Sequence, residues 1–143
     1  SKYPPKGNKG YSPYTRASNY HTQKDYLKKS NKNQIISIII EDKEGLDNIE
    51  EIVKNKEIDI VYIGTYDLSV SLNCDINDIK LKRELERCVR IIRKNKISAG
   101  SLYHDYKELN YFKKIGINFL VYGVDSKIIY DNYKNLKWKK TQK

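Results

Sequence analysis

Two acidic residues in this sequence stand where carboxylates could share a cation. Glu41 directly follows the apolar run Ile35–Ile40, and Asp67 comes shortly after a second run, Ile58–Ile63. Because the carboxyl ends of parallel strands meet at one edge of a sheet, strands that end this way bring their acids together. Two carboxylates with open positions suit Mg²⁺ or Mn²⁺, which bind oxygen and keep several waters. The alternative is that both acids only cap the helices that follow.

The elements that would carry these acids form a repeated pattern. Five of the six residues in Ile35–Ile40 are Ile, which favours a strand buried on both faces. Helical spacing begins at Lys43, a loop follows Asp67, and Asp78 is the expected N-cap of a long helix reaching about Lys94. We expect strands at 35–40, 58–63, 97–102 and 117–122, all parallel and in this order, with helices between them, including 105–114 and one from Asp125.

Alternating strands and helices indicate an α/β protein, but the pattern alone fits both an open four-stranded sheet and half of a barrel. We expect a single partial domain: an ordered loop and short helix over 1–33, four βα units over 34–137, and a basic tail over 138–143. All three prolines fall in the first segment, for which a disordered leader is the alternative.

Composition bears on whether this is a nucleic-acid-binding, membrane or disulfide-rich protein. The net charge of +10 invites a nucleic-acid interpretation. Only five of the 28 basic residues are Arg, the better reader of phosphates and base edges, and this argues against nucleic acid as the partner. No apolar run is long enough for a membrane span. Two cysteines cannot build a disulfide framework, which favours a cytoplasmic protein, and Cys88 falls on an apolar helical stripe typical of a core.

Four segments in order resemble the second half of the HpcH/HpaI aldolase family, metal-dependent pyruvate aldolases: YPPKGNKGYSPYTRAS, IIIEDKEGLDNIEEI, IDIVYIGTYDLS and GINFLVYGVDS. The resemblance runs from Tyr3 to about Leu136. It implies the C-terminal half of a (β/α)8 TIM barrel of the phosphoenolpyruvate/pyruvate type, with these strands as the fifth to the eighth. It also implies Mg²⁺ or Mn²⁺, or another divalent cation, on Glu41 and Asp67.

By the same resemblance, backbone N–H groups after Gly64, from Thr65 and Tyr66, grip the carboxylate of pyruvate. The substrates are a small keto acid and an aldehyde, and the protein is a homo-oligomer. The chain departs from the family at Lys9 and Ile39, where the family has Arg and Gln, and at Thr65, where Pro is common. The opening segment would place Lys9 and Arg16 near the mouth of the site.

The resemblance implies a divalent-metal-dependent lyase that cleaves or forms a C–C bond in a 4-hydroxy-2-keto acid through a pyruvate enolate. The family's catalytic Arg and His belong to the front half of the barrel, so no catalytic residue is identified in these 143 residues, which alone are expected to be inactive. Two alternatives remain open. One is an incomplete half barrel that binds metal or keto acid or serves as an assembly piece; the other is a basic nucleic-acid binder.

Overall fold

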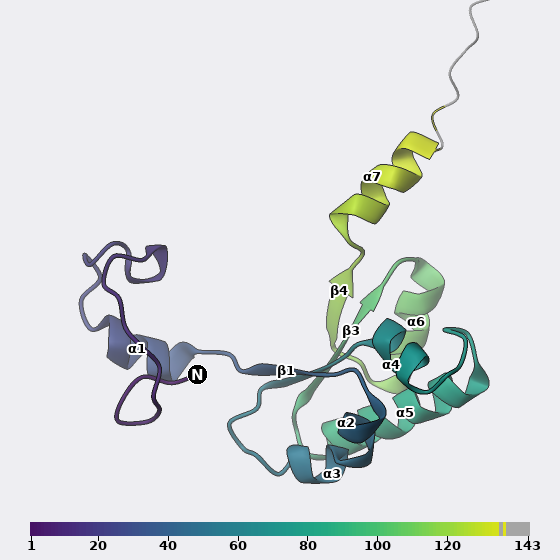
Figure 1. Cartoon of the computed structure of the whole chain (residues 1–143), viewed down its shortest axis with the longest axis horizontal. Helices are drawn as coiled ribbons and strands as arrows, with labels where there is room; N and C mark the ends of the chain where they lie inside the picture. The colour runs from purple at the N-terminus through teal and green to yellow at the C-terminus, as the bar shows by residue number, and fades with distance from the viewer. Residues whose placement is uncertain (135, 137–143) are drawn as a thin grey trace, which may run out of the picture.

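The fold centres on a four-stranded parallel sheet whose strands follow one another in chain order, as the sequence predicted. The computed structural model describes residues 1–134 and 136. The strands are β1 (Ser37–Ile40), β2 (Ile60–Ile63), β3 (Ser98–Tyr103) and β4 (Phe119–Tyr122). The helices are η1 (Arg16–Ser18), α1 (Tyr26–Asn33), α2 (Lys43–Asp47), α3 (Ile49–Ile52), α4 (Thr65–Ser71), α5 (Ile79–Lys94), α6 (Tyr106–Ile115) and α7 (Asp125–Lys134) (Figure 1).

One face of the sheet packs against the helices and forms the core. Ile40, Val61, Ile63 and Ala99 point to this side, where they meet buried residues of the helical layer. The stripe of α5 supplies much of that layer, with Leu81, Leu85, Cys88, Val89 and Ile92 all buried. Burial raises the pKa of the Cys88 thiol to about 12, so this cysteine is an inert core residue, as expected.

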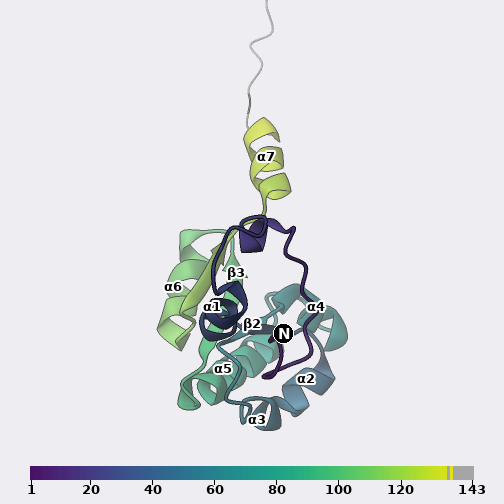
Figure 2. The ribbon, with the colours of Figure 1, turned by 90° about the vertical axis from the view of Figure 1, so that its left-hand side faces the viewer.

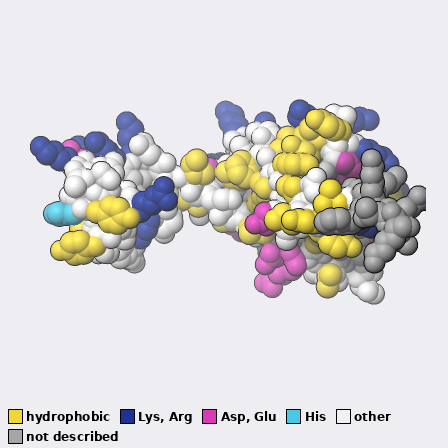
Figure 3. Space-filling model, turned by 90° about the horizontal axis from the view of Figure 1, so that it is seen from above, with side chains coloured by type: hydrophobic (Ala, Val, Ile, Leu, Met, Phe, Trp, Pro, Cys, Tyr) yellow, Lys and Arg dark blue, Asp and Glu magenta, His cyan; other side chains and the backbone are white. Residues whose placement is uncertain are grey.

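The opposite face of the sheet is largely bare in the described part of the chain. Ile39, Tyr62, Gly100 and Phe119 form one row across the strands. Ile39 is 58% exposed and Phe119 42%. The prediction that β1 is buried on both faces is therefore wrong: β1 is an edge strand covered on one side only. Figure 3 shows hydrophobic side chains gathered on the sheet-and-helix body as seen from above.

Two helical predictions need correction. The pattern from Lys43 gives two short helices, because the chain leaves helical geometry at Asn48 (φ −93°, ψ 4°) and the Asn48 side chain bonds to the Glu44 carbonyl. The expected loop after Asp67 contains a short helix, α4, held on the core by the buried side chains of Leu68 and Leu72.

The two ends of the described chain stand away from this body. The first 33 residues pack on themselves: the rings of Tyr3, Tyr11 and Tyr26 lie about 6 Å apart, and Asn31 bonds to both backbone groups of Tyr3. Helix α7 projects beyond β4 in both views and buries none of its residues (Figures 1 and 2). The predicted basic tail, 138–143, lies outside the described residues. No helix that the structure describes is long and apolar enough to cross a membrane.

Candidate functional site

Glu41 and Asp67 both lie next to Gly64, where β1 and β2 end. The strands are in register to their last residues, Ile40 and Ile63, and the Gly64 N–H donates to the Ile40 carbonyl at 3.0 Å. A Cβ placed on Gly64 would lie 3.3 Å from the Glu41 Cβ and 3.6 Å from an Asp67 carboxylate oxygen. The absence of a side chain at Gly64 therefore leaves a space that both acidic residues border.

Neither Glu41 nor Asp67 caps a helix through a side-chain hydrogen bond, although Asp67 in the first turn of α4 still complements the helix dipole. Asp42, not Glu41, is the N-cap of α2, and its side chain accepts a hydrogen bond from the Gly45 N–H at 2.7 Å. The N-cap of α4 is Gly64, so Asp67 sits within the first turn of the helix. Within the described residues neither carboxylate has a hydrogen-bond or ion-pair partner, and both side chains are exposed. Two carboxylates at one strand edge thus keep their oxygens available to a ligand.

The donor set fits a hard divalent cation of the Mg²⁺ or Mn²⁺ kind. Both donors are carboxylate oxygens, the ligands such ions prefer, and Gly64 leaves room between them. Among residues 1–134 and 136 no third His, Cys, Asp or Glu joins the pair. The remaining positions would therefore belong to water and to substrate oxygens, which is the usual coordination of these ions in enzyme sites.

The backbone at the start of α4 offers a second kind of binding group. The first N–H groups of a helix have no intrahelical partner, and the helix bond of Leu68 is the first one closed, to the Gly64 carbonyl at 3.0 Å. The amides of Thr65 and Tyr66 have no acceptor in the part of the chain that is described. The residues predicted to hold a carboxylate thus present free donors beside the acidic pair.

His104 was not identified from the sequence as a neighbour of this site. The Tyr66 ring meets the His104 ring edge-on, 6.2 Å between centroids, and the His104 N–H donates to Glu108 at 2.7 Å. Ile39 approaches the Gly64 position as well, with its Cγ2 3.8 Å from the placed Cβ. The contact between Tyr66 and His104 joins α4 to the loop between β3 and α6, far apart in the chain, so no local pattern could reveal it.

The structure does not bring the expected basic residues of the first segment to the acidic pair. The Lys9 ammonium lies over the Tyr3 ring, 4.8 Å from its centroid, inside the N-terminal cluster. Arg16 is exposed in η1, in the same cluster. Figure 1 shows this segment and α1 on the far side of β1 from α4. Lys2 forms an ion pair with Glu57, which precedes β2. This contact therefore lies at the opposite end of the strands from the acidic pair.

Known proteins resemble this chain over nearly its whole length. A hydroxypyruvate/pyruvate aldolase of Deinococcus radiodurans is 30% identical over 132 residues, covering 90% of this chain and 48% of the relative. A 5-keto-4-deoxy-D-glucarate aldolase of Klebsiella pneumoniae is 28% identical over 127 residues, covering 87% of this chain and 50% of the relative. The chain therefore spans about half the length of these curated relatives.

Solved structures give the same picture at lower identity. An HpcH/HpaI aldolase/citrate lyase family protein from Burkholderia cenocepacia superimposes with a TM-score of 0.86 at 20% identity, over 93% of this chain and 54% of the other. An HpcH/HpaI aldolase from Desulfitobacterium hafniense gives 0.76 at 20% identity, over 95% and 57%. These matches support the α/β fold and a partial barrel. The family model for HpcH/HpaI aldolase/citrate lyase matches residues 1–131. This chain belongs to the HpcH/HpaI aldolase/citrate lyase family.

Proposed function

We propose that this chain forms the metal-binding half of a divalent-metal-dependent aldolase that acts on a 4-hydroxy-2-keto acid. The observation that carries the proposal is the convergence of Glu41 and Asp67 on Gly64, with neither acid used as a helix cap. Membership in an aldolase family and the names of the two relatives, which act on keto acids, support the reaction class.

In this proposal Glu41 and Asp67 would hold Mg²⁺ or Mn²⁺ through carboxylate oxygens. The bound cation would supply a Lewis acid that stabilises negative charge on the keto oxygen while the adjacent C–C bond breaks. The Thr65 and Tyr66 amides, at the positive end of α4, would bind the substrate carboxylate and fix the keto acid in one orientation. Ile39 would place an apolar side chain next to the keto acid and limit access of water from that side.

Cleavage converts the 4-hydroxyl of the substrate into the carbonyl of the aldehyde product and leaves an enolate that takes up a proton to give pyruvate. We assign neither proton transfer to Glu41, Asp67, Gly64, Thr65 or Tyr66. These residues bind and orient. The groups that move protons would come from the rest of the barrel, which the relatives' greater length provides.

The bare row of Ile39, Tyr62 and Phe119 and the exposed helix α7 support the proposal that the active form contains more than this chain. A barrel interior is filled by side chains from all its strands, so four strands leave half of those places empty. The homo-oligomer that the resemblance implies would in addition cover apolar side chains on α7, such as Ile129 and Tyr133.

The test is turnover by the full-length protein. With Mn²⁺ it should release pyruvate from a 4-hydroxy-2-keto acid, measured by coupling to lactate dehydrogenase, and Asp67→Ala and Glu41→Gln should each abolish that release. Absence of turnover in a protein that binds Mn²⁺ at this pair would support the alternative, a non-catalytic half barrel.

A further inference from the structure

A groove of about 470 Å³ lies between α4, α5 and α6, on the helical side of the sheet. Its floor is formed by Leu81, Leu85 and Phe112, which are 3%, 3% and 6% exposed. Half-buried Ile76 and Tyr111 add to its walls. Small-molecule sites in proteins commonly have about this volume and an apolar lining, so the floor suits a body of one or two rings.

The acidic side chains around this groove are already committed to other groups. Asp105 caps α6 by accepting from the Glu108 N–H at 2.8 Å, and Glu108 accepts from the His104 N–H at 2.7 Å. The Tyr111 hydroxyl donates to Glu86 at 3.0 Å. Burial and this hydrogen bond raise the pKa of Tyr111 to about 12, so its hydroxyl stays neutral. Asp105 and Glu108 therefore each already accept a hydrogen bond from a backbone N–H of the protein.

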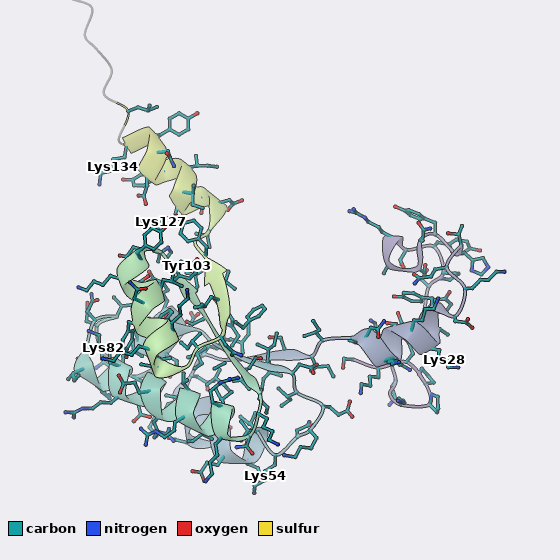
Figure 4. The ribbon with its side chains drawn as sticks, turned by 180° about the vertical axis from the view of Figure 1, so that it is seen from behind. Lys28, Lys54, Lys82, Tyr103, Lys127 and Lys134 are labelled. Atoms are coloured by element: carbon teal, nitrogen blue, oxygen red, sulfur yellow. The ribbon has the colours of Figure 1, made fainter. Side chains whose placement is uncertain are left out.

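The lysines of the groove have no such commitment. Lys82 and Lys107 line it, both are exposed, and within residues 1–134 neither makes an ion pair or a side-chain hydrogen bond. Lys80, two residues before Lys82, does donate to the Leu72 carbonyl at 2.7 Å. In Figure 4 the labelled Lys82 extends from the beginning of α5. Two free ammonium groups beside an apolar floor complement a molecule with an apolar body and a negative charge.

We propose that this groove binds a small organic carboxylate with an aromatic body. The ring would rest on Leu81, Leu85 and Phe112, and the carboxylate would lie between Lys82 and Lys107. None of Glu41, Gly64 and Asp67 lines the groove, so the proposal does not need the cation. Thr65 and Tyr66 do line one end of it, and an occupant would therefore contact the start of α4, the helix that carries Asp67.

Calorimetry on the full-length protein tests this with indole-3-acetate as probe and indole-3-acetamide as its uncharged isostere. We expect a dissociation constant of about 1 mM for the acid, from the affinity that good contacts give a molecule of this size, and binding at least about fivefold weaker for the amide. Lys82→Gln and Lys107→Gln should each weaken the acid by about fivefold. Lys113→Gln, which removes an exposed lysine of α6 outside the groove, should leave it unchanged.

Leu85→Trp, which adds volume to the floor, should abolish binding, and a thermal melt shows whether that variant still folds. If Leu85→Trp does not fold, the lysine variants, which change surface residues, still test the proposal. Three results would overturn the proposal: no heat of binding up to about 20 mM acid, equal affinities for acid and amide, or unchanged affinity in both lysine variants.

Discussion

Replacing Gly64 by Ala should weaken cation binding at the site while leaving the free energy of unfolding almost unchanged. The new Cβ would lie 3.3 Å from the Glu41 Cβ and 3.6 Å from an Asp67 oxygen. The first distance is a few tenths of an ångström below the optimal carbon–carbon contact. Because the Glu41 Cβ is fixed to its backbone, the end of β1 must shift by that amount, which is a small strain at an edge strand. Gly64 has φ −82°, which any residue can adopt, and Ala restricts the unfolded chain. The free energy of unfolding should therefore change by less than about 1 kcal/mol.

Cation affinity should respond much more strongly, because the methyl group fills the space that both carboxylates border. We expect Gly64→Ala to weaken Mn²⁺ binding by about tenfold or more, a loss typical of displaced ligands or their supports. Manganese EPR on the full-length protein measures the affinity, and urea denaturation measures the stability. Gly10→Ala is the matched control, since a Cβ there meets nothing within 4 Å. Affinity in Gly64→Ala within about threefold of the wild type would refute the convergence of the two acids.

Three further outcomes are expected. The isolated chain should associate at low micromolar concentration because of its bare sheet face. In light scattering Ile39→Lys should reduce that association, while Val70→Lys, at an exposed position of α4, should not; a wild-type chain that stays monomeric contradicts this. Asp78→Ala, which removes the N-cap of α5 that accepts from the Lys80 N–H, should lower the free energy of unfolding by about 1 kcal/mol in urea; an unchanged midpoint would show that the cap contributes nothing. Folding raises the pKa of Cys88 and Tyr111 from their ordinary 9.0 and 10.0 to about 12, so their contribution to stability is complete below about pH 9 and is lost as pH rises towards 12; urea denaturation from pH 8 to about 11 should show that fall.

The order and direction of the strands could be predicted because each strand is an apolar run followed by turn residues and a helical period. The residues at which each strand begins, and the faces of the strands that are covered, could not be predicted. Ile35, expected inside the first strand, is 68% exposed and lies outside the ladder. A run of Ile indicates a strand but not whether a second layer covers it, and that depends on chain far away in sequence. The same limit applies to Ile39, which faces the bare side.

Of the candidate site, the positions of Glu41 and Gly64 at strand ends followed from local pattern. A loop was expected after Asp67, whereas Asp67 and the residues that follow it to Ser71 lie in α4. The spacing of Leu68 and Leu72 by four residues was a signal for that helix. The neighbours contributed by other segments, such as His104, have no signature of this kind. They come together only when helices and loops far apart in the chain pack side by side.

The central claim is that Glu41 and Asp67 together bind one divalent cation, and a Mn²⁺ titration of the full-length protein followed by EPR tests it most directly. The wild type should bind one ion at this pair, and Asp67→Ala and Glu41→Gln should each weaken it by about tenfold or more. Asp47→Ala, which removes another exposed acid, one already paired with Lys43, should leave the affinity unchanged. Mn²⁺ binding that is absent in the wild type, or that survives Asp67→Ala at full affinity, would contradict the claim.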